Sequence, residues 1–192
     1  MPKGTGTGIT MGSERMLAGP PSRENGGCSE CCWKGLMAHG AESSIVITEV
    51  RSMQLVCVLP MPPQSTTPLL PAPFVTALQW SPQPMQRDLL LTQELSTAHL
   101  RLAVGDRQGR IAIWDAPSRQ VTDWMATGSE LGNGIQDLCW LQQKKHSNRW
   151  LLMAIHGPSL LAIWNTQNGR CIWKYDPSPE ILFCVRRDKL YA

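Results

Sequence analysis

An internal repeat constrains this chain more than any other feature of its sequence. Three windows align without a gap: Leu36–Glu49, Leu102–Asp115 and Leu152–Asn165. The second and third windows share the ending Ala-Ile-Trp, followed by an aspartate or an asparagine. Each window is typical of a strand, a tight turn and a second strand, because short apolar runs flank a cluster of turn residues.

The tryptophans follow the same repeat. One Trp precedes each window, one lies inside each of the last two windows, and one more follows each of those two. Trp114 and Trp164 are 50 positions apart, so the repeating unit is long enough for four strands. We predict that these tryptophans form the structural core of the units: Trp33, Trp80, Trp114, Trp124, Trp140, Trp164 and Trp173.

Four strands per unit and a Trp-Asp ending are typical of a β-propeller blade. The sequence therefore predicts an all-β fold, a partial propeller over residues 28–192 with blades at about 28–60, 74–128 and 134–176. Residues 180–185 have the pattern of the first strand of a next blade. Residues 1–27 are rich in Gly, Ser and Pro, and we expect a disordered tail there.

The Trp-Asp repeat resembles the WD-repeat β-propellers. The segments GIQDLCWL and LLMAIHGPSLLAIWN resemble more closely the N-terminal propeller of the family of WD repeat-containing protein 11, and the likeness extends over about Trp33 to Val185. This resemblance implies a scaffold in vesicle tethering at the trans-Golgi network and in ciliogenesis and Hedgehog signalling. It also implies a location at the trans-Golgi network, the cilium base or the nucleus, in addition to the cytoplasmic location that we expect from the lack of a secretory signal.

The repeat departs from the general WD pattern in its polar residues. In generic repeats, a His before the first strand and an Asp in the middle turn hydrogen-bond the Trp. In the second unit, Arg107 and Gln108 stand where that Asp would fall, and Thr48 replaces the Trp in the first unit. We therefore predict a degenerate polar network, with apolar packing of Trp114 and Trp164 holding the blades together.

Composition narrows the function further. The formal net charge is +3 without a basic block, which argues against a nucleic-acid partner. No run approaches the roughly 20 apolar residues of a membrane span, and no secretory signal is evident, so at most peripheral membrane association is expected. The seven cysteines are an odd number, as in a reduced cytoplasmic chain.

Metal binding, catalysis and protein binding are the candidate functions of the remaining residues. Cys28, Cys31 and Cys32 include a Cys-x-x-Cys pair, but a structural zinc site needs four ligands and no second pair exists, so we favour plain thiols over metal binding. No histidine lies in a nucleophile motif, so we predict no enzyme, no cofactor and no catalytic residue. Binding to other proteins is expected at the turns, with these candidate partner-facing residues: Asp106, Arg107, Gln108, His156 and Pro158.

Propellers contain about 4 to 8 blades, and this sequence supplies about three. We expect the open arc to leave an apolar face at each end, because no further blade covers the last buried side chains. A truncated form or fragment without independent function is therefore the alternative to a working scaffold.

Overall fold

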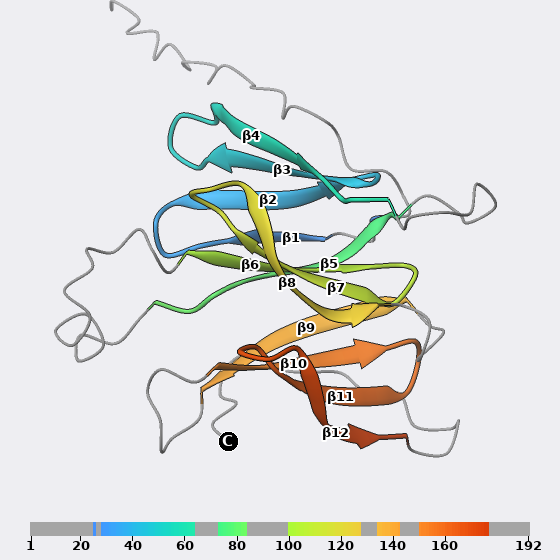
Figure 1. The fold of residues 1–192 in the computed structure, drawn as a ribbon. Coiled ribbons are helices and arrows are strands. Elements are labelled where there is room, and N and C mark those ends of the chain that lie inside the picture. Colours follow the sequence, from blue (N-terminus) through green and yellow to red (C-terminus); the bar gives the residue numbers. More distant parts are fainter. Residues whose placement is uncertain are drawn as a thin grey trace, which may run out of the picture.

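The computed structural model describes residue 25 and residues 28–63, 73–83, 100–127, 134–142 and 150–176. These residues form three antiparallel sheets of four strands each, which are stacked in chain order from the top to the bottom of the view in Figure 1. No helix capable of crossing a membrane occurs among them. The expected strand beginning at residue 180, and all of the expected N-terminal tail except Asn25, lie outside the described residues.

Within each sheet the strands are arranged in chain order. The first blade contains β1 Ser29–Cys31, β2 Leu36–Ala41, β3 Ser44–Glu49 and β4 Leu55–Pro60. The second contains β5 Val75–Trp80, β6 Arg101–Asp106, β7 Arg110–Asp115 and β8 Gln120–Thr127. The third contains β9 Ile135–Gln142, β10 Trp150–His156, β11 Leu160–Asn165 and β12 Arg170–Tyr175. The predicted all-β partial propeller is confirmed.

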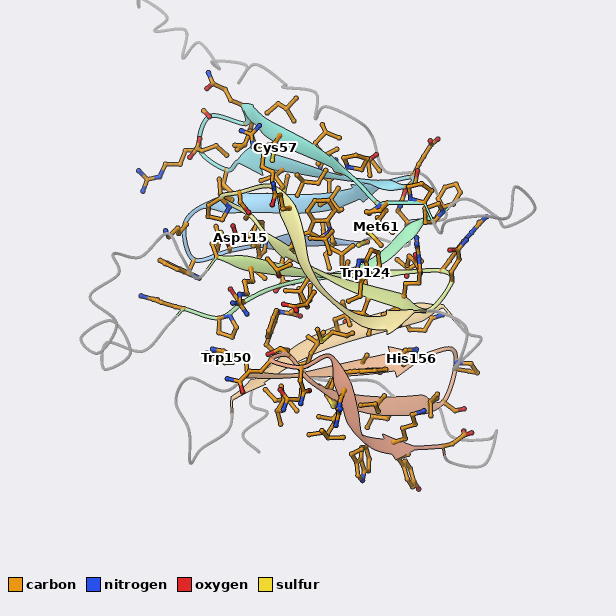
Figure 2. The ribbon with its side chains drawn as sticks, viewed as in Figure 1. Cys57, Met61, Asp115, Trp124, Trp150 and His156 are labelled. Atoms are coloured by element: carbon orange, nitrogen blue, oxygen red, sulfur yellow. The ribbon has the colours of Figure 1, made fainter. Side chains whose placement is uncertain are left out.

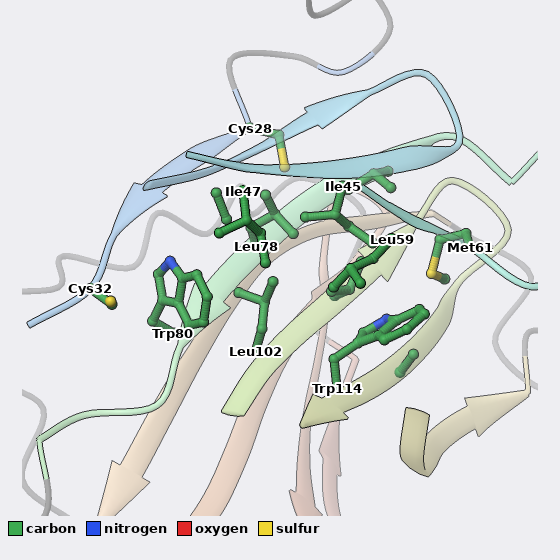
Figure 3. Packing of buried hydrophobic residues seen from close by; sticks show 14 of the residues in the cluster. Cys28, Cys32, Ile45, Ile47, Leu59, Met61, Leu78, Trp80, Leu102 and Trp114 are labelled. Atoms are coloured by element: carbon green, nitrogen blue, oxygen red, sulfur yellow. The ribbon is translucent and has the colours of Figure 1, made fainter. Parts of the chain in front are cut away.

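The blades pack face to face because strand side chains alternate between two faces. We call the face toward the next blade along the chain the forward face, and the opposite face the back face. The forward face of the first blade packs on the back face of the second, where Ile45 and Ile47 meet Leu78, Leu102 and Trp114 in one buried cluster (Figure 3).

The second contact repeats this arrangement. Ile111 and Ile113 on the forward face of the second blade join Ile135, Leu152 and Trp164 on the back face of the third blade in another buried cluster. All five side chains are at most 5% exposed. Apolar burial between successive blades is therefore the main source of stability, at about 25 cal/mol per Å².

Glycine sets how closely the blades approach. A Cβ added to Gly105 on β6 would lie 2.5 Å from Ile135 on β9, a distance that real Cβ atoms do not reach. Gly40 on β2 has the same role one blade earlier, since its added Cβ would lie 3.3 Å from Val75 on β5. The first strand of each following blade thus rests directly on the backbone of the preceding one.

Tryptophans on the first strands add a repeated hydrogen bond between blades. Trp80 Nε1 donates to the carbonyl of Glu30 (3.1 Å), and Trp140 Nε1 donates to the carbonyl of Gln79 (3.0 Å). Both indoles are buried, so each has a satisfied polar atom and a large apolar contact area. These bonds fix the register of one blade against the next.

Four of the seven predicted core tryptophans are buried: Trp80, Trp114, Trp140 and Trp164. The prediction was wrong for Trp33, Trp124 and Trp173, which are 36–45% exposed. Trp33 follows β1 and takes no part in the pairing of β1 with β2. The position equivalent to Trp80 in the first blade is Cys31, because Cys31 pairs with Met37 as Trp80 pairs with Leu102. Trp124 and Trp173 lie on the outer strands β8 and β12, and within the described part of the chain no strand pairs with the far side of either.

The gap-free alignment is also wrong by one residue in β2. Gly40 pairs with Ile45 and leaves four residues in the first-blade turn, whereas Gly105 pairs with Ile111 and leaves five in the second. Gly40 is therefore equivalent to Gly105, as their contacts with the next blade also indicate. The shorter turn places Glu42 at φ 54°, which a two-residue hairpin requires.

We expect Gly105→Ala to destabilise the chain by about 1–3 kcal/mol, the usual cost of overpacking, because the new methyl collides with Ile135. Gly40→Ala is the matched control, and its smaller overlap predicts a smaller loss. Urea unfolding followed by tryptophan fluorescence measures both. Equal stability of wild type and Gly105→Ala would contradict this account of blade spacing.

Candidate interaction surface

Turns that join the second and third strands of the blades lie along one edge of the stack, at the right in Figure 1. In the β6–β7 turn, the Asp106 carboxylate accepts hydrogen bonds from the backbone N–H of Gln108 (3.0 Å) and of Arg110 (2.9 Å). The Arg110 guanidinium donates to the same carboxylate at 2.6 Å, and the ion pair is buried. Asp106 therefore holds the turn closed from inside.

The same ion pair connects two blades. Arg110 Nη1 donates to the carbonyl of Pro62, which follows β4 of the first blade (3.0 Å). The guanidinium also lies over the ring of Trp124, 5.4 Å from its centroid. The prediction that Arg107 and Gln108 replace the turn aspartate was wrong, because Asp106 itself supplies that carboxylate one position earlier.

His156 has the equivalent position in the third blade, at the end of β10 (Figure 2). Its side chain is fully buried, and neither ring nitrogen has a hydrogen-bond partner among the residues that the structure describes. Burial lowers the pKa of His156 to about 4, with a smaller contribution from the positive charge of Lys174. The ring contacts Trp164, with 6.2 Å between ring centroids, and Leu160 stands opposite it in the register.

Asp106 and His156 were predicted to face a partner, and this was wrong for both, because their side chains point between blades and are 0% exposed. The other three predicted residues lie at the surface of the turns. Arg107 and Gln108 are half-buried and Pro158 is exposed. Arg107 stacks on Phe74, 4.4 Å from the ring centroid, which fixes the direction of its guanidinium. We call Arg107, Gln108 and Pro158 the turn rim.

Asn25 was missed by sequence reasoning, which assigned it to a disordered tail. Its side chain is 0% exposed, and its amide nitrogen donates to the carbonyls of Glu42 (2.9 Å) and Val75 (2.8 Å). Its side-chain oxygen accepts from the Glu42 N–H (2.8 Å). Asn25 therefore fastens the first blade to the second beside the β2–β3 turn.

The cysteine cluster does not assemble a metal site among the described residues. Cys28 and Cys32 are buried in the contact between the first two blades, whereas Cys31 is exposed on the other face of β1. No group of three or more His, Cys, Asp or Glu side chains suited to a metal ion occurs in the described part of the chain. Alternation along an extended strand separates these thiols.

Comparison with known proteins agrees with the blade geometry. The family model described as the WDR11 first β-propeller matches residues 19–191. The chain belongs to this family. WD repeat-containing protein 11 of Danio rerio is 30% identical over 168 residues, and that of Homo sapiens is 28% identical over 170. Each match covers 88% of this chain but 12% of the relative, so the chain spans about an eighth of their length.

Two further matches are more distant. U3 small nucleolar RNA-associated protein 4 of Saccharomyces cerevisiae is 26% identical over 48% of this chain. A chain in the crystal structure of the mitotic checkpoint complex superposes with a TM-score of 0.55 at 13% identity, covering 91% of this chain and 47% of that one. The latter supports the fold alone. The WDR11 family match indicates a protein-interaction scaffold, since WD-repeat propellers are in general non-catalytic.

We expect Asp106→Asn to destabilise the chain by about 3 kcal/mol, because Arg110 then keeps a buried charge without its counter-ion. Asp115→Asn is the control, as Asp115 only accepts from Ser118 in an exposed turn and should cost about 1 kcal/mol or less. Replacing both partners, Asp106→Leu with Arg110→Leu, should cost less than Asp106→Asn. Urea unfolding gives the free energy of unfolding of each variant. If Asp106→Asn lost no more stability than Asp115→Asn, Asp106 would not be needed as the counter-ion of Arg110.

Stability should also depend on pH through His156. The unfolded ring titrates near 6.5 and the folded ring near 4, so the unfolded state binds the proton first as the pH falls. The free energy of unfolding is therefore highest above about pH 6.5, declines between pH 6.5 and pH 4, and levels off below pH 4. The total loss through His156 is about 3 kcal/mol. Unfolding of wild type and His156→Leu across this range isolates the contribution. Parallel pH profiles would show that His156 does not titrate this way.

Proposed function

We propose that this chain is a non-catalytic scaffold that binds other proteins through the turn rim. The observation that carries this proposal is the contrast within the turns. Asp106 and His156 are buried in the blade contacts, while Arg107, Gln108 and Pro158 lie next to them at the surface. A buried frame with polar and rigid side chains at its edge is the arrangement in which loops on a fixed scaffold bind partners.

Preorganisation of the rim supports the same proposal. The Arg107 guanidinium is stacked on Phe74, and its backbone N–H donates to the Phe74 carbonyl at 2.9 Å. The β6–β7 turn is closed by the buried Asp106. Little conformational entropy is then lost when a partner contacts Arg107, so more of the contact energy remains for binding.

The finer roles are proposed from membership of the WDR11 family. On that basis the chain takes part in vesicle tethering at the trans-Golgi network, and in ciliogenesis and Hedgehog signalling. Because the chain matches about an eighth of the length of its relatives, we propose these roles for the propeller as one contact surface within such an assembly.

A rim substitution should remove partner proteins without unfolding the chain. We expect Arg107→Glu and Pro158→Asp to reduce recovery of specific partners from cells by roughly tenfold or more, because both place a carboxylate in the contact. Quantitative affinity purification of the tagged full chain measures this loss. Gln167→Glu, exposed in the β11–β12 turn at the opposite edge, is the matched control.

Circular dichroism of each purified variant separates lost binding from lost folding. If both rim variants retain the same proteins as Gln167→Glu, the turn rim is not the binding surface. Imaging of the tagged chain with a trans-Golgi marker tests the finer role separately, and a distribution unrelated to the marker would contradict it.

A further inference from the structure

The outer strand of each blade has one edge to which no strand pairs among the described residues. These strands are β4, β8 and β12. An unpaired strand edge presents backbone N–H and C=O groups that can pair with a strand of another chain. Charged side chains on the edge strand are a common means of preventing such pairing. The three outer strands can therefore be compared by the charges that they carry.

β4 differs from the other two outer strands because it has no charged residue. Its sequence is Leu-Val-Cys-Val-Leu-Pro, whereas β8 contains Asp123 and β12 contains Arg170 and Lys174. A strand that pairs with the same strand of a second copy brings each of its charges into the contact twice. Like charges on paired strands are destabilising. Charge therefore opposes self-pairing at β8 and β12 and does not oppose it at β4.

The side chains of β4 are also exposed, although they are aliphatic. Leu55, Val56 and Val58 are 49%, 42% and 48% exposed. The back face of the same sheet is covered, since Val46 and Thr48 are at most 2% exposed. The apolar surface that a partner can reach is thus the outer strand itself and not the sheet face behind it. Removing these side chains from water would favour association.

The direction of the backbone indicates which residues of β4 a second strand can pair with. The Met61 N–H donates to the Ser43 carbonyl at 2.8 Å, so it points toward β3. Backbone groups of successive residues in a strand point to opposite edges. Val58 and Val56 therefore direct their N–H and C=O groups away from β3. The register shift beside Thr48 also leaves Val56 without a partner on β3.

The sequence of β4 suits a second copy of the same strand. Residues 55–59 read Leu-Val-Cys-Val-Leu in both directions. In an antiparallel pair centred on Cys57, Val56 of one copy lies opposite Val58 of the other, and Leu55 lies opposite Leu59. Opposed residues whose backbone groups face each other can exchange two hydrogen bonds. This register therefore pairs the outward backbone groups and places only aliphatic side chains beside the central cysteines.

We propose that two copies of this chain associate through β4, antiparallel about a two-fold axis at Cys57. The two first blades, with four strands each, then form one continuous sheet. Each copy has one β4 edge, and a two-fold contact uses both, so this contact leaves no edge for further growth. The turn rim belongs to the second and third blades, so association through β4 can be tested separately from binding at the rim.

Sedimentation velocity of the purified full chain over a range of concentrations tests this proposal. We expect a species of twice the 21.3 kDa mass of one chain. Val58→Lys should weaken association by roughly tenfold or more, because a lysine on an edge strand opposes pairing with another strand. Ile172→Lys is the matched control and should associate as the wild type does, since Ile172 is an aliphatic residue of β12 and is 54% exposed.

Mixing two variants tests the register of the pair. Val56→Glu should weaken association as Val58→Lys does. In a mixed pair centred on Cys57, the introduced carboxylate lies opposite the introduced ammonium group, so the mixture should associate more tightly than either variant alone. Circular dichroism of each variant verifies that it is folded.

Three results would overturn the proposal. A wild-type chain that stays monomeric at all concentrations would show that β4 does not pair between copies. Association of Val58→Lys as tight as that of Ile172→Lys would place the contact elsewhere. A mixture no tighter than its two components would rule out the pairing centred on Cys57.

Discussion

The close approach of each blade to the backbone of the one before it is the contact on which the rest of the structure depends. Gly105 and Gly40 lack the side chains that would hold Ile135 and Val75 away. Only at that distance can Trp80 and Trp140 reach the carbonyls of the preceding blade. The apolar clusters between blades then surround these contacts.

The second and third blades carry different polar side chains at one equivalent position. The second blade has the buried pair of Asp106 and Arg110, which also reaches the first blade through Pro62. The third has His156 and Leu160, and the histidine is kept neutral by burial. Since buried polar groups without partners are costly, the second and third blades differ in how tightly their turns are held.

The repeat predicted the all-β blades and most of their strands, because apolar alternation and turn residues are local signals. The repeat did not predict features that depend on turn length or on contacts between residues distant in sequence. One residue fewer in the first turn shifts the register of β2, and no pattern within the strand records that shift. The residues at the turns show the same limit. Asp106 and His156 are polar and border turns, yet each ends a strand on the face that packs against the preceding blade, so both side chains are buried. Asn25 stood in a Gly-rich stretch, and only its partners Glu42 and Val75, distant in sequence, give it a role.

Asn25 also has a consequence for how the chain is made. Its bonds reach residues 17 and 50 positions downstream. Asn25 is synthesised 50 residues before Val75, so the residue that closes the first junction must wait for the second blade to begin. Folding here does not simply follow the order of synthesis, because the contacts of an early segment of the polypeptide are completed only when a later one has been made.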